Sequence, residues 1–240
     1  MLLVILVVEH ESTCPPALFG AGLDSSGVGS QVVRPYRGDR LPDDLDRYTG
    51  LVVLGGEMAA WDDEVAPWLP AVRTLMARAV TDRVPTLGIC LGAQLLALAC
   101  GGEVARGSAG FEIGVTTVTA LPQAGADPYF GAVGDRLGSA QWPVRNFHGD
   151  AVTVLPPDAE LLVTGKVYPH QGFRVGENAW AVQYHPEVPD AGFGEWVDQG
   201  FASNGRPADP EAVMAQIHAT QAIQARTSLA HAAAFAAQLS

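Results

Sequence analysis

The first half of the chain alternates between short apolar runs and one longer segment in which apolar residues recur at helical spacing. The runs are rich in Val, Leu and Ile without polar alternation, which is typical of strands covered on both faces; they are residues 2–8, 31–36, 51–55 and 86–90. Between the third and fourth runs the helical spacing is that of Trp68, Val72, Leu75, Met76 and Val80. The order strand, helix, strand predicts a parallel sheet.

The second half of the chain changes character. Its apolar runs are short and are joined by Gly, Pro and Asp turns, and they are residues 112–121, 151–155, 160–164, 172–175 and 179–184. These runs predict antiparallel additions to the same sheet. After them, Asp209 followed by Pro210 has the pattern of a helix N-cap and first helical position, so the alanine-rich tail predicts one or two helices packed on the outside.

The predicted elements indicate an α/β fold with a mostly parallel central sheet, flanking helices, antiparallel strands in the second half and a C-terminal helical tail. With 240 residues, 48% of them hydrophobic, the chain can bury a full core. It shows no internal repeat and no low-complexity linker. We therefore expect one domain over residues 1–206, with residues 207–240 as a helical extension packed on it.

Charge and cysteine content narrow the classes of partner and compartment. The formal charge of −12, with no cluster of Lys or Arg, argues against nucleic acid and against an anionic membrane surface. The apolar opening of eight residues before Glu9 is too short for a membrane span or a signal peptide. Three cysteines argue against a disulfide framework and for a reducing compartment, so we expect a cytoplasmic protein.

One cysteine lies in a pattern that carries chemistry. Gly88-Ile89-Cys90-Leu91-Gly92 places Cys90 between a buried strand and a helix over residues 91–100, which is the context of a nucleophile elbow. The N-terminal amides of that helix favour a thiolate, and the Leu91 N–H is free to hold an oxyanion. A free cysteine can equally be a small buried hydrophobe. A nearby base would decide between the two interpretations.

Among the six histidines, His185 is the best candidate for that base. We expect no role for His218 and His231, which lie in the tail, and solvated side chains for His10 and His170. His185 follows a strand that Pro186 ends, so its imidazole emerges where an open α/β sheet presents its site. Glu187, two residues on, can orient the ring. Cysteine, histidine and acid together predict an acyl-transfer triad.

Four motifs in this order resemble the class I glutamine amidotransferases, and the nearest relatives are amidotransferase domains of the GMP synthetase type. The motifs are GGEM at 55–58, GICLGAQ at 88–94, FHGD at 147–150 and QYHPEV at 183–188, and the resemblance covers roughly residues 1–190. It implies the flavodoxin-like fold of that family. It also implies Cys90 as nucleophile, His185 as general base and then acid, and Glu187 as the orienting carboxylate.

The resemblance implies further site residues. The oxyanion donors would be the backbone N–H groups of Gly56 and Leu91. Gly55 would let the backbone approach the substrate closely, Gln94 would hydrogen-bond its α-amino or α-carboxylate group, and His148 would help to shape the glutamine pocket. One departure is Glu57, which stands where relatives commonly have proline. Since a proline would have fixed the turn, we expect weak hydrolysis by the isolated chain until a partner binds.

The sequence offers no site for a metal ion or cofactor. Cys14 and Cys100 have no partner at C-x-x-C spacing, no two histidines stand at i and i+4, and the double glycine lacks the G-K-[ST] ending of a phosphate loop. We therefore expect neither a metal nor a cofactor.

Three functional hypotheses follow. The first is glutamine hydrolysis to ammonia and glutamate through a γ-glutamyl thioester, with a synthetase partner, if any, in another chain. The second is a stand-alone hydrolase of γ-glutamyl peptides or amides with the same triad. The third is a non-catalytic binding or regulatory protein on this scaffold.

Overall fold

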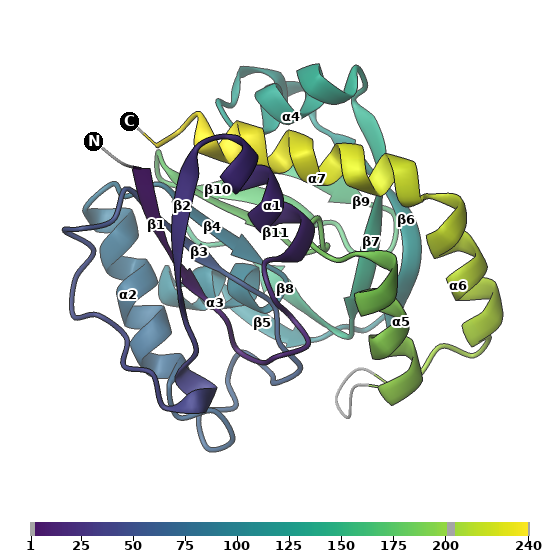
Figure 1. Cartoon of the computed structure of the whole chain (residues 1–240), viewed down its shortest axis with the longest axis horizontal. Helices are drawn as coiled ribbons and strands as arrows, with labels where there is room; N and C mark the ends of the chain where they lie inside the picture. Colours follow the sequence, from purple (N-terminus) through teal and green to yellow (C-terminus); the bar gives the residue numbers. More distant parts are fainter. Residues whose placement is uncertain (1–2, 201–204, 240) are drawn as a thin grey trace.

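A nine-stranded sheet forms the centre of the computed structural model, which describes residues 3–200 and 205–239 (Figure 1). Five neighbouring strands pair in parallel, in the order β2 (Val28–Val33), β1 (Leu3–Val8), β3 (Gly50–Val53), β4 (Thr86–Ile89) and β11 (Ala179–Val182). The sheet continues in antiparallel pairing through β10 (Gly172–Val175), β9 (Ala159–Gly165), β6 (Glu112–Ala120) and β7 (Gln141–His148). A separate antiparallel pair consists of β5 (Glu103–Arg106) and β8 (Asp150–Val154).

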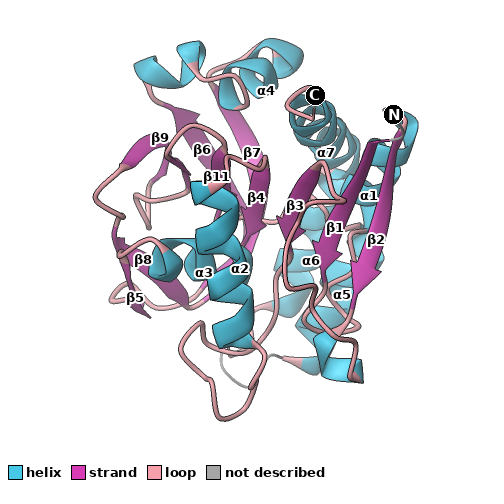
Figure 2. Cartoon of the chain, turned by 90° about the vertical axis from the view of Figure 1, so that its left-hand side faces the viewer, coloured by secondary structure: helices cyan, strands magenta, loops and turns pink. Residues whose placement is uncertain are grey.

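Helices cover both faces of the sheet, so that the molecule has three layers (Figure 2). One face carries α2 (Leu69–Thr81) and α3 (Leu91–Ala99). The other carries α1 (Ala17–Ser25), α4 (Phe130–Leu137) and α7 (Gln221–Ala236). The remaining helices, α5 (Asp190–Gln199) and α6 (Pro210–Ala219), pack beside β6 and β7 around a third apolar cluster, and two 3-10 turns span Pro35–Arg37 and Pro122–Ala126.

The apolar run of β1 shows why its strand needs cover on both sides. Successive side chains of a strand point to opposite faces. Ile5 and Val7 accordingly enter the core that α1 and α7 close, and Leu6 and Val8 enter the core that α2 and α3 close. All four are buried. The predicted α/β fold, mostly parallel in its first half, is confirmed.

Two of the predicted strands differ in the structure. The second strand begins at Val28 and ends at Val33, because Pro35 starts a 3-10 turn inside the predicted range. Residues 151–154 of the predicted strand at 151–155 belong to β8, which pairs with β5 and does not join the main sheet. Pattern alone identifies a strand, whereas its partner depends on how the chain folds back.

Sequence analysis did not predict β5, β7, α1, α4 or α5. The missed β7 is one of the two edge strands of the main sheet, and it carries Pro143, Arg145 and Asn146 in its interior, so it is not an apolar run. An edge strand tolerates proline because one side needs no ladder hydrogen bond. Helix α1 carries two glycines in nine residues, which hides its helical pattern.

The C-terminal segment forms two helices, and the second belongs to the core. Asp209 caps α6 by accepting a hydrogen bond from the backbone N–H of Ala212 at 2.9 Å. Helix α7 lies across α1 and α4, shown in yellow in Figure 1. Its Ala232 and Phe235 are fully buried. Within the described residues, no helix combines the length and apolarity that crossing a bilayer requires.

Candidate active site

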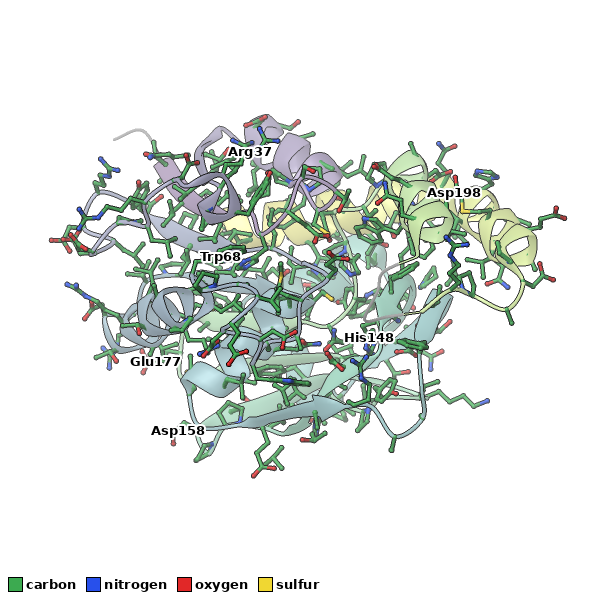
Figure 3. All side chains as sticks on the ribbon, turned by 90° about the horizontal axis from the view of Figure 1, so that it is seen from below. Arg37, Trp68, His148, Asp158, Glu177 and Asp198 are labelled. Carbon is green, nitrogen blue, oxygen red and sulfur yellow. The ribbon has the colours of Figure 1, made fainter. Side chains whose placement is uncertain are left out.

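The candidate residues gather at the carboxyl ends of four neighbouring parallel strands, β1, β3, β4 and β11. The arrowheads of β1 and β2 in Figure 2 point to the bottom of the molecule, and Figure 3 views the molecule from below, with Trp68 and His148 on either side of the middle. Open α/β sheets present their sites at this end. The segments after these strands carry Glu11, Gly55, Cys90 and His185.

Cys90 occupies a sharp turn between β4 and α3. Its backbone angles are φ 51° and ψ −105°, a conformation that a residue with a side chain rarely adopts. The flanking glycines make the turn sterically accessible. A Cβ on Gly92 would lie 2.0 Å from the carbonyl oxygen of Val53, and one on Gly88 would lie 2.5 Å from that of Gly92. Strand and helix can therefore pack this closely around Cys90 only because both positions lack side chains.

The start of α3 surrounds the cysteine with backbone donors. The first N–H groups of a helix have no acceptor within the helix, and Leu91 is its first residue. Together with the positive end of the helix dipole, these groups can stabilise negative charge that develops beside Cys90 during a reaction. The side-chain amide of Gln183 also donates to the Cys90 sulfur at 3.6 Å.

His185 lies just beyond β11, buried to 2% exposure. Its Nδ1 is 2.6 Å from Oε1 of Glu187, so the carboxylate holds the ring from one side. The ring also packs edge-on against Trp196 of α5, with 4.7 Å between centroids. Gln224 of α7 donates to the His185 carbonyl at 2.9 Å. Three separate elements thus fix the position of this imidazole.

The charge state of His185 follows from its neighbours. Burial lowers its pKa, but the negative charges of Glu187 and Cys90 and its hydrogen bonds with both outweigh burial and raise the pKa to about 10. An imidazolium paired with a cysteine thiolate is the active form of a cysteine nucleophile with a histidine base.

The double glycine after β3 lies directly against this pair. A Cβ on Gly55 would be 3.0 Å from Cε1 of His185 and 3.6 Å from Cβ of Cys90. A Cβ on Gly56 would be 3.0 Å from a methyl carbon of Leu91. The backbone of Gly55 therefore lies directly against Cys90 and His185, and Gly56 lies against the side chain of Leu91.

A small pocket opens beside Cys90. Its volume is about 10 Å³, and it is lined by Gly56, Glu57, Met58, Cys90, Gln94, His148 and Asp150. This is room for about one water molecule. A glutamine side chain would enter only if flexible side chains such as those of Glu57 and Met58 moved.

Gln94 and His148, the two side chains expected to contact substrate, both line this pocket, and both are also bonded to the protein. Gln94 donates to the Asp150 carbonyl at 3.0 Å and to Oε1 of Gln183 at 3.2 Å. His148 has Nδ1 at 2.9 Å from the Asp150 carbonyl and Nε2 at 3.1 Å from Glu112. Because both its ring nitrogens face these acceptors, His148 is poorly placed to serve as the base for Cys90.

Sequence reasoning missed several residues that touch the candidate triad, among them Gln183, Trp196 and Gln224. Gln183 was read only as part of the QYHPEV motif; it follows β11, which ends at Val182, and its side-chain amide donates to the Cys90 sulfur. No sequence pattern pointed to Trp196, because its contact with His185 depends on how α5 packs. Trp196 is itself held by a hydrogen bond from its indole N–H to the Thr13 carbonyl at 2.9 Å.

The expectation that His10 is solvated was wrong. His10 is fully buried, its Nδ1 accepts a hydrogen bond from the indole of Trp68 at 3.0 Å, and burial lowers its pKa to about 3. His231 of α7 is also fully buried between the hydroxyls of Tyr129 and Tyr184, with its pKa likewise lowered to about 3 by burial. Both environments come from distant segments that local sequence does not reveal.

Over residues 3–200 and 205–239 there is no group of three or more His, Cys, Asp or Glu side chains arranged to hold a metal ion.

Comparison with known proteins places this site in a family context. The model of the family described as Glutamine amidotransferase class-I matches residues 21–201. A solved glutamine amidotransferase from Methylobacillus flagellatus superimposes with a TM-score of 0.84 at 27% identity, covering 100% of this chain and 96% of the other.

Curated relatives carry two kinds of name. Gamma-glutamyl peptidase 3 of Arabidopsis thaliana is 29% identical over 144 residues, which is 60% of this chain and 56% of the relative. A glutamine-hydrolysing GMP synthase of Porphyromonas gingivalis is 32% identical over 157 residues, which is 65% of this chain and 28% of the relative. The chain thus matches about half of the peptidase and about a quarter of the synthase.

Proposed function

Because the chain belongs to the class I glutamine amidotransferase family, we propose that it hydrolyses γ-glutamyl amide bonds with Cys90, His185 and Glu187. The observation that carries the proposal is the buried His185–Glu187 contact of 2.6 Å beside Cys90 at the start of α3. This is a nucleophile with a base that a third group orients.

The steps of the reaction follow from this arrangement. The Cys90 thiolate attacks the side-chain amide carbon, and the backbone N–H groups of Gly56 and Leu91 hold the oxyanion. His185 gives its proton to the nitrogen, the C–N bond breaks, and a γ-glutamyl thioester remains on Cys90. His185, now neutral, takes a proton from water as that water attacks the thioester. Glutamate leaves and the thiolate–imidazolium pair is restored.

Glutamine is the first substrate we propose, with ammonia as the leaving group. The family and the GMP synthase relative support it. Ammonia would then pass to a synthetase partner in another chain.

A γ-glutamyl peptide is the second candidate, supported by the relatives named gamma-glutamyl peptidases. In that case the leaving group is an amino compound, and hydrolysis requires no partner. The exposed position of Glu57 at the rim of the pocket is consistent with a leaving group that extends into solvent.

The test is a steady-state assay of the purified chain with glutamine and with a series of γ-glutamyl dipeptides, in which glutamate and the released amine are both measured. We expect turnover that Cys90→Ser lowers by at least about three orders of magnitude. Cys100→Ser is the matched control, since Cys100 is half-buried and its pKa is raised to about 11, by burial and by the charge of Asp158.

A second readout needs no substrate. Iodoacetamide should modify Cys90 faster than Cys14 or Cys100, because burial above all raises the pKa of each of the latter two thiols. Equal labelling of the three cysteines, together with no hydrolysis of any substrate, would favour the non-catalytic alternative.

A further inference from the structure

The side chain of Glu11, in the segment after β1, ties that segment to the segment after β3. Its Oε2 accepts a hydrogen bond from the backbone N–H of Glu57 at 3.1 Å. Its Oε1 accepts from the Thr13 hydroxyl at 2.8 Å and from the Cys14 thiol at 3.1 Å. The Glu11 carboxylate is therefore held in place by the segment after β1, and it hydrogen-bonds the backbone of the segment after β3.

The Glu57 N–H that donates to Glu11 belongs to the peptide that joins Gly56 to Glu57. Gly56 is the residue whose own N–H is the expected oxyanion donor, and glycine has the widest backbone freedom of any residue. A hydrogen bond on the next peptide plane restricts that freedom. Glu11 itself is not among the residues that line the pocket beside Cys90.

A second contact with the segment after β3 is made by His10. The Cβ of His10 lies 3.1 Å from where a Cβ on Gly56 would be, so the two residues are in close contact. His10 is itself held by the hydrogen bond from Trp68 to its Nδ1. The side chains of His10 and Leu91 therefore both pack closely against Gly56, while Glu11 holds the peptide that follows.

We propose that Glu11 is a positioning residue that preorganises the oxyanion hole by holding the Gly56–Glu57 peptide, an inference that rests on the proposed function. The departure from the family pattern at position 57 fits this role. A proline there would fix the turn through its φ angle but has no N–H to donate. Glu57 lacks that fixed angle, and the hydrogen bond that its N–H donates to Glu11 takes the place of that restraint.

The first test compares Glu11→Ala with Glu11→Gln in the full chain. Glu11→Ala should lower kcat at least tenfold and leave KM within twofold, because an oxyanion contact strengthens only in the transition state. Glu11→Gln should recover most of kcat, since its amide oxygen can accept the same N–H. Melting temperatures measured for each variant separate this loss from general destabilisation.

The second test removes the donor, which is the Glu57 N–H, instead of the acceptor, which is the Glu11 carboxylate. Glu57→Ala and Glu57→Pro both lack the carboxylate, but only the alanine variant keeps the N–H. Glu11→Ala should cost at least tenfold in kcat in the Glu57→Ala background and nothing further in the Glu57→Pro background. Equal losses in both backgrounds would overturn the proposal, as would kcat within twofold of the parent for Glu11→Ala in an active enzyme.

A third measurement does not depend on activity. Hydrogen exchange of the Glu57 amide, followed by NMR, should be at least tenfold faster in Glu11→Ala than in the parent chain. If the parent hydrolyses no γ-glutamyl substrate, the proposed function fails by itself, and the positioning claim is decided by this exchange rate. Unchanged exchange would refute it.

Discussion

At the scale of single residues, the contact between His185 and Glu187 determines how the site is charged. The pair is buried, so the carboxylate's charge acts on the ring with little screening by solvent. Burial alone would lower the pKa of His185, whereas Glu187 and Cys90 together raise it to about 10. The proton available for the leaving nitrogen therefore depends on both partners of the histidine.

This arrangement predicts that substitutions of His185 and of Glu187 affect the reaction rate differently. His185→Ala removes proton transfer and should lower kcat at least about 10³-fold. Glu187→Gln keeps the shape and should cost less, but loss of the negative charge should lower the pKa of His185. NMR titration of the His185 ring in both the parent and Glu187→Gln would measure that shift. An unchanged titration, or full activity in His185→Ala, would contradict the assignment.

At the scale of elements, the C-terminal helix α7 reaches the site that the strands build. Gln224 on this helix donates to the carbonyls of His185 and Pro186, at 2.9 and 3.1 Å. It is 3% exposed, so the bonded groups have no access to water. The segment after β11 thus depends on a helix some forty positions further along the chain.

Gln224→Leu should lower the free energy of unfolding by about 2 kcal/mol, because it leaves two buried carbonyls without their donor. It should also lower kcat, since the His185 segment loses an anchor. Gln221→Leu, at an exposed position on the same helix, is the matched control and should change stability by less than about 0.5 kcal/mol. Urea unfolding and steady-state rates measure both. Similar behaviour of the two variants would show that the contact has no special role.

At the scale of the whole molecule, buried histidines determine how stability responds to pH. His10 and His231 must be neutral in the folded chain, because burial lowers the pKa of each to about 3 from an ordinary value of 6.5. As the pH falls, the unfolded chain therefore binds protons at these two side chains at a higher pH than the folded chain does. Their contribution is therefore complete above pH 6.5 and is lost between 6.5 and about 3. The raised pKa of His185 acts oppositely, since its contribution is complete below pH 6.5 and is lost as the pH rises towards 10.

We expect the free energy of unfolding to fall by about 2 kcal/mol for each of His10 and His231 between pH 7 and pH 5. Urea unfolding at these two pH values measures the fall. His231→Gln should reduce it by about half, whereas His218→Gln, at an exposed position, should leave it unchanged. A fall that is the same in all three proteins would refute the role assigned to His231.

Local patterns in the sequence predicted the elements that carry the chemistry. The apolar runs at residues 2–8, 51–55 and 86–90 match β1, β3 and β4 within two residues at each end, because strands covered on both faces need continuous apolar side chains. The Gly-x-Cys-x-Gly spacing predicted the turn at Cys90, since its steric demand lies within five residues. The spacing of His185 and Glu187 predicted their contact for the same reason.

Only the tertiary structure decided which distant segments meet. The pairing of β11 with β4 brings His185 to Cys90 across 95 positions, and β8 pairs with β5 although its pattern also suits the main sheet. Three further contacts likewise join segments that are far apart in the chain. They are those that bury His10, the contact of Trp196 with His185, and the hydrogen bond from the Glu57 N–H to Glu11. Propensity and periodicity act over a few residues, whereas these contacts depend on how the elements pack, and no local pattern encodes that packing.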